Sequence, residues 1–449
     1  MTAASHRAKV ESLLAGLRSG ASVGLAKKTS NLFRDRVADG RRPSKPRIDL
    51  SGFDEVVNID VAAGTVEAEG MTTYARLVDE TLAHGVMPCV VPQLKSITLG
   101  GAAAGVGIEA SSFKYGLAHE TLAAIDVLLA DGTIAHCTPD NEHRDLFFGF
   151  PNSYGTLGYA LKLTTKAVPV KPYVAIQHLR HHDPLRYFQH LADVCDARNA
   201  DFVDGTVFSG KEMYLTLGRF ADTAPRTSDY TFENIYYRSI REKESDCLTT
   251  HDFIWRWDTD WFWCSKNLYV QNPLVRRLVG RKRLNSTTYT KVMRWNSKWG
   301  ITRALTRLSG RTPESVIQDV DIPIERCAEF LEFFLREIGI TPVWICPIRA
   351  WDANNDFVLY RYDPKTTLVN FGFWDVVRSA EEHPAGWYNR KIERKVRELG
   401  GIKSLYSDSY YPEDEFWKIY NRPAYEALKR RYDPDGRFRD LYQKCVLRR

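Results

Sequence analysis

The sequence predicts an α+β protein, and three observations support this fold class. Short strand-like segments and tight turns alternate through the first third of the chain. Two later segments each repeat the order strand, helix, strand, strand, which is typical of a cap domain with an antiparallel sheet. The chain has 449 residues, enough for two or three domains with separate cores. We therefore expect a first α+β domain followed by an α+β cap.

The first third contains two predicted hairpins and one predicted helix. Residues 55–60 and 65–69 are strand-like and flank a short turn that contains glycine. Residues 123–129 and 133–136 flank an Asp-Gly turn in the same way. Between the hairpins, residues 74–84 have apolar side chains at helical spacing and stop at a glycine, which predicts an amphipathic helix.

The two repeated units of the cap are defined by hydrophobic pattern and length. The first unit consists of strands 173–181, 202–209 and 213–220 and helix 184–197. The second unit consists of strands 316–322, 343–348, 357–360 and 368–374 and helix 324–338. The shared order predicts a pseudo-duplicated sheet, although the two halves show no evident sequence identity.

Composition excludes several classes of protein. The net charge of +6 is modest, and we expect no nucleic-acid partner. The eight cysteines form no C-x-x-C pair, so we expect neither a zinc ribbon nor a redox dithiol. The adjacent residues His181 and His182 would point to opposite faces of a strand, so we expect no metal site there. No signal-peptide pattern and no membrane-spanning run of about 18 apolar residues is present.

One segment, residues 252–299, carries most of the tryptophans and many basic residues. Arginine and lysine at 276, 277 and 281–283 alternate with leucine and valine. Two interpretations remain open. The segment is either a solvated basic helix face, or a functional surface that rests on anionic lipid headgroups or covers an apolar substrate.

A glycine-rich segment, residues 91–116, is the strongest functional signal. It holds five glycines with small alanines between them, and its bare backbone amides suit a pyrophosphate. A second glycine-containing turn follows at residues 151–158, and a polar segment precedes it at residues 27–34. Their order along the chain, more than any single residue, predicts a dinucleotide site.

These segments carry a resemblance to a known family. The matching motifs are KKTSNLFR, VPQLKSITLGGAAAGVGIEASSFKYGLAHET, DLFFGFPNSYGTLGYALKL, WDTDWFW, QNPLVRR, PVWICP and YSDSYYPEDEFW. In these motifs the chain resembles the Δ24-sterol reductases, which belong to the vanillyl-alcohol-oxidase-like FAD superfamily. It is also similar to bacterial relatives that reduce a 10-methylene fatty acyl chain, and motifs shared by both groups do not choose between them.

The resemblance implies a domain order and a cofactor. It implies an N-terminal lead over 1–26, a two-subdomain PCMH-type FAD-binding domain over 27–170, a substrate cap over 171–400, and a segment over 401–449 that returns to the FAD domain. The implied cofactor-binding residues are Lys28, Thr29, Ser30, Asn31, Leu99, Gly100, Gly101, Ala102, Gly105, Gly107, Ser111, Ser112, Gly116, Asn152, Ser153, Gly155 and Gly158.

We expect the FAD to be bound without a covalent link. Neither residues 27–34 nor residues 91–116 contain a histidine, and Cys89 has the context of a packed thiol. His119 remains a residual candidate for attachment. No Rossmann fingerprint for a separate nicotinamide domain is present, so either NADPH as reductant visits the same site in turn, or another electron donor is used.

The resemblance implies reduction of an unactivated lipid C=C bond, which needs a hydride and a proton. Glu109 is the first candidate proton donor, because a carboxylate beside a pyrophosphate should be repelled unless it has a role; the others are His119, Glu120 and Asp408. We expect a 10-methylene fatty acyl chain as substrate, because the basic Trp-rich segment suits phospholipid-held chains and no N-terminal membrane helix is seen.

Three alternatives stay open: a Δ24-sterol side-chain reductase, a flavin oxidase of an alcohol, and a non-catalytic flavin- or lipid-binding protein. We expect a cytoplasmic protein, either free or peripheral at the inner face of the membrane through residues 252–299. A functional pairing with a lipid methyltransferase would supply the methylene substrate.

Overall fold

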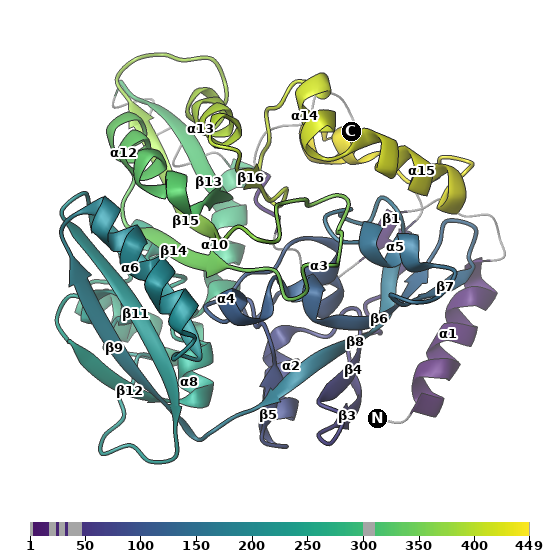
Figure 1. Ribbon diagram of the computed structural model, residues 1–449, viewed down its shortest axis with the longest axis horizontal. Coiled ribbons are helices and arrows are strands. Elements are labelled where there is room, and N and C mark those ends of the chain that lie inside the picture. Colours follow the sequence, from purple (N-terminus) through teal and green to yellow (C-terminus); the bar gives the residue numbers. More distant parts are fainter. Residues whose placement is uncertain (1–2, 18–23, 27–31, 35–46, 300–309, 449) are drawn as a thin grey trace.

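The computed structural model describes residues 3–17, 24–26, 32–34, 47–299 and 310–448. Two sheets divide these residues into a first body and a cap, which lie at the right and left of Figure 1. Helices and antiparallel strands build both bodies, so the predicted α+β class is confirmed. The two-subdomain PCMH-type arrangement stays a prediction.

The first body is built on a six-stranded antiparallel sheet in the order β3-β4-β8-β6-β7, with β5 paired to β8. Its strands are β3 Val56–Asp60, β4 Thr65–Glu69, β5 Val86–Pro88, β6 Leu122–Leu128, β7 Ile134–Cys137 and β8 Tyr159–Pro169. The β3–β4 and β6–β7 hairpins are those that the sequence predicts, and Gly64 and Gly132 take positive φ in their turns.

Short helices accompany this sheet: α2 Tyr74–Leu82, α3 Leu99–Ala104, α4 Ser112–Tyr115, η1 Ala118–Thr121 and α5 Arg144–Gly149. Helix α2 begins where the Thr73 side chain accepts a hydrogen bond from the Arg76 amide, and it buries Leu77 and Val78. It ends at Leu82, two residues earlier than the sequence predicts.

Both ends of the chain pack on the first body. Helix α1 (Ala3–Leu17) is fixed by His6 and Lys9, whose side-chain nitrogens lie 2.8 and 2.7 Å from the Glu69 carboxylate. Strand β1 (Gly24–Ala26) pairs in parallel with β2 (Arg47–Asp49). Helix α14 (Glu413–Ile419) precedes α15 (Arg422–Tyr432), and α15 lies beside α5 in Figure 1, where the Tyr432 hydroxyl donates to Asp145 at 2.6 Å.

The cap is an eight-stranded antiparallel sheet in the order β12-β9-β11-β10-β14-β15-β13-β16. Its strands are β9 Tyr173–His181, β10 Phe202–Ser209, β11 Glu212–Ala221, β12 Ser245–Thr249, β13 Thr312–Pro323, β14 Val343–Ile348, β15 Leu368–Ser379 and β16 Ile402–Lys403. The order β9-β11-β10 in the first half is matched by β13-β15-β14 in the second, and β10 joins β14 at the centre. The predicted duplication of strand order is therefore present.

One predicted strand of the cap is wrong. Residues 357–360 form a turn, although their apolar and aromatic side chains suit a strand. The Val358 amide donates to Phe148 O at 3.2 Å, so the backbone is used to join the first body and not to extend the cap sheet. Contact with another body has overridden local strand propensity.

The two faces of the cap sheet bury different sets of side chains. One face is covered by α6 (Pro184–Ala197), α12 (Cys327–Glu337) and α13 (Trp387–Glu398), and its core includes Leu215, Val320 and Phe371. In Figure 1 these three helices lie over the cap strands, with α12 between α6 and α13. The other face belongs to the larger core that the cap shares with the first body.

The Trp-rich segment packs partly on this second face. It includes α8 (Thr250–Ile254), a 3₁₀ turn Cys264–Leu268, α9 (Pro273–Val279) and α10 (Ser286–Trp299), and a short helix α7 (Tyr236–Ser239) precedes it. Trp255, Trp257, Trp261 and Trp263 are buried. Among the described residues, no helix combines the length and the hydropathy needed to cross a bilayer.

Candidate functional site

The glycine-rich segment and the turn at residues 151–158 meet in the first body. The Asn152 amide donates to Gly105 O at 3.2 Å, and the Tyr154 amide donates to Ala104 O at 2.8 Å. Helix α3, which carries Ala104, begins where Thr98 Oγ1 accepts from the Gly101 amide. Two of the three segments predicted to bind the cofactor are thus joined by backbone hydrogen bonds.

The polar segment at residues 27–34 reaches the same place through its last two residues. The Arg34 guanidinium carbon lies 5.2 Å from the centre of the Tyr154 ring. The Phe33 amide donates to Tyr406 O at 3.0 Å. The predicted residues Lys28, Thr29, Ser30 and Asn31 lie outside the described residues.

Two predicted glycines are required by packing. A Cβ atom on Gly100 would lie 2.7 Å from Gly70 O, and one on Gly107 would lie 2.9 Å from the Ala118 methyl group. Both distances are too short for a real side chain. Gly100 therefore allows α3, and Gly107 allows the loop that follows it, to pack closely on their neighbours, whatever the loop binds.

The other predicted binding residues have mixed environments. Ser111 and Ser112 are buried and serve the loop itself, because Ser111 Oγ donates to Cys89 O at 2.7 Å and Ser112 Oγ accepts from the Glu109 amide at 3.1 Å. Leu99 and Ala102 are buried on α3, Gly101 is exposed, Gly116 follows α4, and Gly155 and Gly158 lie in the turn before β8.

Two buried polar atoms in the third segment lack a partner. Asn152 Oδ1 and Ser153 Oγ form no hydrogen bond within the described part of the chain, and both side chains are fully buried. The Asn152 amide group is nevertheless fixed, since Nδ2 donates to Leu359 O at 2.8 Å. Buried polar atoms without partners are costly, and these two are the groups of this segment that a polar ligand would satisfy. The residues present fit the polar groups of a dinucleotide such as FAD.

Glu109 lies at the interface between the two bodies. Its Oε1 atom is 3.2 Å from Arg256 Nη2, and its Oε2 atom accepts from Gln93. The same Arg256 nitrogen lies 2.7 Å from Asp204 Oδ2 on β10. The Glu109 carbonyl accepts from Cys346 Sγ at 3.1 Å on β14. Glu109 is thus tied to both central strands of the cap.

The charge balance of this cluster favours a bound proton. Burial raises the pKa of the Glu109 carboxyl to about 7, against the opposing effect of Arg256, and the negative charge of Asp204 raises it further. One guanidinium shared by two buried carboxylates leaves one negative charge unpaired, which a proton neutralises. Glu109 can therefore hold a proton near neutral pH, but both of its oxygens are already hydrogen-bonded.

His119 and Glu120 occupy neighbouring positions with different roles. His119 is buried, both its ring nitrogens lack a partner among the described residues, and its ring packs 4.6 Å from that of Phe357. Burial lowers the pKa of His119 to about 3, so it is neutral. Glu120 accepts from the Leu117 and Trp351 amides and from the Tyr362 hydroxyl, each at 2.9 Å. These bonds make Glu120 a buried structural link between the two bodies.

Asp408 belongs to a different network from Glu109. Its amide donates to Phe33 O at 3.1 Å, its carbonyl accepts from Lys403 Nζ at 2.6 Å, and its carboxylate lies 3.6 Å from Arg448. The structure thus does not bring the four predicted catalytic residues to one point. Glu109 and Glu120 bridge the bodies at different points, His119 is buried beside Phe357, and Asp408 lies beside the polar segment.

Asp319 and Asp321, which sequence reasoning missed, lie on the cap face that is directed at the first body. Both belong to β13 and are buried. The Tyr360 hydroxyl and Asn370 Nδ2 donate to Asp321 at 2.6 and 2.7 Å. Asp319 is hydrogen-bonded by Tyr406, but its Oδ1 atom has no partner within the described residues. The alternation of strand QDVDIP places both carboxyl groups on one face, but the local sequence does not show that this face is buried.

Asp319 is placed to hold a proton next to an aromatic ring. Burial raises its pKa to about 8, and repulsion by Asp321 contributes. A Cβ on the facing residue Gly372 would lie 2.8 Å from Asp319 Oδ1 and 2.6 Å from the Trp374 ring, so Gly372 leaves room in which both groups meet. Trp374 Nε1 donates to the Tyr406 hydroxyl at 3.0 Å.

An aromatic cluster lines the same face. The Phe262 ring is stacked on Trp374 and Trp257, with centroids 4.3 and 4.9 Å apart. Trp261 and Phe262 both take positive φ, which is unusual for bulky residues and marks local backbone strain. The Phe33 ring lies 5.3 Å from that of Trp261, so this cluster reaches the polar segment of the first body.

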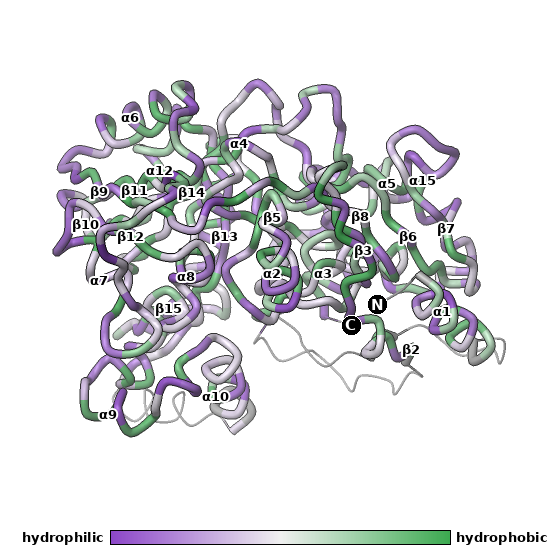
Figure 2. The backbone as a smooth tube through the Cα atoms, turned by 90° about the horizontal axis from the view of Figure 1, so that it is seen from below, coloured by the Kyte–Doolittle hydropathy of each residue, from purple (hydrophilic) through white to green (hydrophobic). Residues whose placement is uncertain are grey.

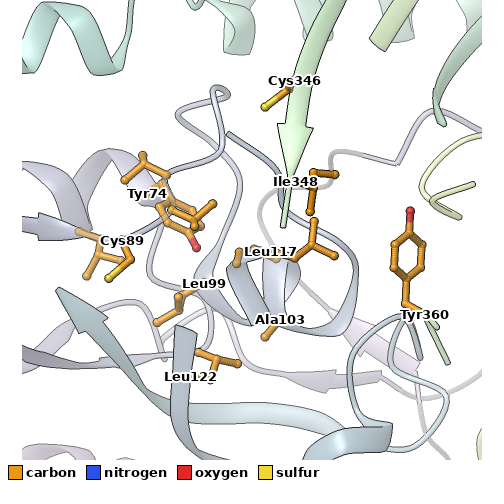
Figure 3. Packing of buried hydrophobic residues seen from close by; sticks show 14 of the residues in the cluster. Tyr74, Cys89, Leu99, Ala103, Leu117, Leu122, Cys346, Ile348 and Tyr360 are labelled. Atoms are coloured by element: carbon orange, nitrogen blue, oxygen red, sulfur yellow. The ribbon is translucent and has the colours of Figure 1, made fainter. Parts of the chain in front are cut away.

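Part of the interface between the bodies is apolar, beside polar contacts such as that of Lys114 Nζ with Asp201 at 3.1 Å. Figure 3 shows the end of β14, with Ile348, directed at Leu117 and at the helix that carries Leu99 and Ala103. Cys89 lies in the same core, and burial raises the pKa of its thiol to about 12, so it is an unreactive packed group. No cluster of three metal-ligating side chains occurs in the described parts of the chain.

Comparisons with known proteins agree with this arrangement. Residues 30–138 match a family of FAD binding domains. A Δ24-sterol reductase homolog of Caenorhabditis elegans is 25% identical over 87% of this chain and 77% of its own length. The human Δ24-sterol reductase is 24% identical over 87% of this chain and 76% of its own length. The Δ24-sterol reductase of Pisum sativum is 26% identical over 91% of this chain and 78% of its own length. The matches thus cover both bodies.

Proposed function

The chain is a Δ24-sterol reductase-like FAD-binding oxidoreductase, and we propose that it reduces an isolated C=C bond of a lipid with Asp319 as the proton donor. The observation that carries this proposal is the extent of the similarity. It covers 87–91% of the chain and therefore includes the cap with its carboxyl and aromatic face, beyond the cofactor-binding body. A shared cofactor domain alone would leave the substrate class open.

The comparisons change the preferred substrate. The proteins they identify are named for the Δ24 bond of a sterol, so a sterol side chain replaces the 10-methylene fatty acyl chain as the first candidate. The acyl chain remains the second candidate, supported by the exposed basic and apolar surface of α9 and α10. Protonation of either alkene at its less substituted carbon gives a tertiary cation, so one mechanism serves both.

FAD, once bound and reduced, would supply the hydride, with NADPH as the proposed electron source. The chain's own residues supply the proton and the surroundings. Asp319, protonated below about pH 8, gives its proton to the alkene from the partner-free side of its carboxyl group. The indole of Trp374 lies beside the same atom and would steady the developing positive charge by about 0.5–2 kcal/mol.

Hydrogen bonding favours Asp319 over Glu109 as the donor. Both oxygens of Glu109 are occupied, by Arg256 and Gln93, whereas Asp319 keeps one oxygen without a partner among the described residues. Asp319 also lies near the proposed cofactor site. The side chain of Tyr406 is hydrogen-bonded to Asp319, and the backbone carbonyl of Tyr406 accepts from the amide of Phe33 in the polar segment. We assign Glu109 a positioning role, in which it fixes the glycine-rich segment against the cap.

The substrate proposal is tested by the absorbance of the purified protein under argon. The oxidised flavin should be yellow, should bleach with NADPH, and should be reoxidised by a Δ24-unsaturated sterol but not by its saturated product. Reoxidation by a phospholipid carrying a 10-methylene chain, and not by the sterol, would replace the first candidate with the second.

Two further outcomes would contradict the reductase itself. Rapid reoxidation by air together with reduction by an alcohol would indicate an oxidase. A colourless protein that takes up no added FAD would indicate a non-catalytic protein. Acid denaturation completes the test, because we expect all of the flavin in the supernatant if it has no covalent link.

A further inference from the structure

Helix α9 buries a charged side chain and exposes its leucines, which is the reverse of an ordinary amphipathic helix. Its charged residue Arg276 points inward, is buried, and donates to both oxygens of Asp260 at 2.7 and 2.9 Å. Leu274 and Leu278, one turn apart, are 71% and 84% exposed. Since residue 276 is two positions from each leucine, the leucines occupy the opposite side of the helix. Burying an arginine while exposing two leucines is unfavourable for a helix that faces only water.

Helix α10 continues this exposed apolar surface. Val292 and Trp295 are three positions apart on one side of the helix, and Trp295 is 57% exposed. Tyr289 lies on the inner side, where its hydroxyl donates to Thr259 O at 2.8 Å. A six-residue connection separates α9 from α10. The two helices therefore present apolar side chains outward while polar anchors hold their inner sides.

The charged residues within this stretch of sequence have one sign, and acidic residues that precede it, Glu233 and Asp229, pair with Arg277 and Arg281. Residues 264–299 contain nine lysines and arginines and neither an aspartate nor a glutamate. Lys282 and Arg283 are exposed in the connection between the helices, and Lys291 is exposed on α10. Exposed leucine and tryptophan beside exposed lysine and arginine is the composition of segments that lie in the interface of anionic membranes.

The position of the helices suits contact with a flat surface. Figure 2 shows α9 and α10 projecting from the cap, with hydrophobic stretches along α9. The anchor of α9 is also linked to the candidate site, because Asp260 directly precedes Trp261 and Phe262 of the aromatic cluster. The buried ion pair between Arg276 and Asp260 therefore connects α9 to the aromatic face of the cap.

We propose that α9 and α10 dock the protein on an anionic phospholipid bilayer, with Leu274, Leu278 and Trp295 entering the interface and Lys282, Arg283 and Lys291 meeting the headgroups. An acidic protein surface would satisfy the charges, but it would give no reason for apolar side chains spread over two projecting helices. The proposal goes beyond the proposed reductase function, because bilayer binding needs neither flavin nor substrate.

Vesicle sedimentation with the purified full chain tests this proposal. We expect binding to phosphatidylglycerol vesicles, weak binding to phosphatidylcholine vesicles, and loss of binding at high salt. The double variant Leu274→Glu/Leu278→Glu should weaken binding about tenfold or more, and Lys282→Glu/Arg283→Glu should weaken it about tenfold. The matched control is Leu185→Glu/Arg186→Glu on α6, where Leu185 is 70% exposed.

Each possible outcome decides the proposal. It is overturned if the wild type does not bind anionic vesicles, or if the α6 control lowers binding as much as the α9 variant does. It is also overturned if the α9 variant changes the sedimentation coefficient without vesicles, because the surface then joins two copies of the chain. Circular dichroism confirms that each variant is folded. Reduction of detergent-dispersed substrate is measured in parallel, so that failure of docking and failure of the reductase function are distinguished.

Discussion

The two faces of the cap sheet use the same strands for different purposes. Toward α6, α12 and α13, alternate residues are almost all apolar: Val203, Leu215, Leu217, Val316, Val320, Ile345, Phe371 and Phe373. Toward the first body, the residues between them include buried polar groups: His178, Asp204, Thr206, Thr216, Asp319, Asp321 and Asn370. The alternation of a strand places these sets on opposite sides.

This difference shows how one sheet separates stability from chemistry. Buried apolar groups stabilise the fold, whereas buried carboxyl groups cost free energy unless they are hydrogen-bonded, paired or protonated. The cap concentrates that cost on the face shared with the first body. Substitutions on the two faces should therefore have separable effects, which the following predictions test from the largest to the smallest.

The largest effect is expected on the face toward the first body. Asp319→Asn removes the proposed proton and should lower kcat about 10²- to 10⁴-fold with little change in FAD content. Because the protonated form of Asp319 is the active one, wild-type activity should fall as the pH rises through about 8, and this limb should be absent in the variant. Steady-state kinetics across pH measures both.

Controls separate Asp319 from its neighbours. Gln318→Ala changes the adjacent residue, which is directed at the helices and donates to Asn389 at 2.5 Å, and it should leave kcat nearly unchanged. If instead the fall of activity with rising pH lies near pH 7 and is absent in Glu109→Gln, then Glu109 is the proton donor, as the sequence suggested.

A substitution on the helix-covered face should do the reverse. Phe334 on α12 is buried and its ring lies 4.5 Å from that of Phe373. Phe334→Ala should lower the free energy of unfolding by about 3–5 kcal/mol, through lost burial and a cavity. Turnover per folded molecule should not change at a temperature where the variant is folded. Urea unfolding beside active-site titration measures the two quantities, and a fall in kcat at unchanged stability would contradict the separation of the faces.

The smallest effect is expected in the first body. Ser153→Ala removes a buried hydroxyl that has no partner within the described residues, so it should weaken FAD binding about 5- to 10-fold, the usual worth of one hydrogen bond. Flavin fluorescence titration of the apoprotein measures the Kd. Thr121→Val is the matched control, because its buried hydroxyl already donates to Ala118 O at 2.8 Å. Equal FAD affinity in Ser153→Ala and the wild type would show that Ser153 does not contact the cofactor.

Local patterns explain which elements could be predicted. The β3–β4 and β6–β7 hairpins and helix α2 follow from turn residues and periodicity within about ten residues. The glycine-rich segment was found because successive glycines are visible without any structure. Asp319 was missed, because an acidic residue in an alternating strand is usually a solvent-facing one. Only the contact between the two bodies makes that face buried.

The turn at residues 357–360 also shows that contacts between the two bodies override a local pattern. Its apolar residues suit a strand, yet Val358 pairs with Phe148 of the first body and Tyr360 reaches Asp321. No pattern within the segment reveals partners that are more than thirty residues away. The packing of the two bodies decided its conformation, and with it part of the candidate site.

By itself the sequence determined the α+β class, the order of the duplicated cap strands and the glycine-containing segments, because hydrophobic period and turn chemistry act over short stretches of chain. Tertiary structure alone decided which carboxyl groups are buried and protonated and which helix exposes its leucines. The pKa of Asp319 and the orientation of Arg276 depend on residues brought close only by folding, and a linear pattern does not contain those distances.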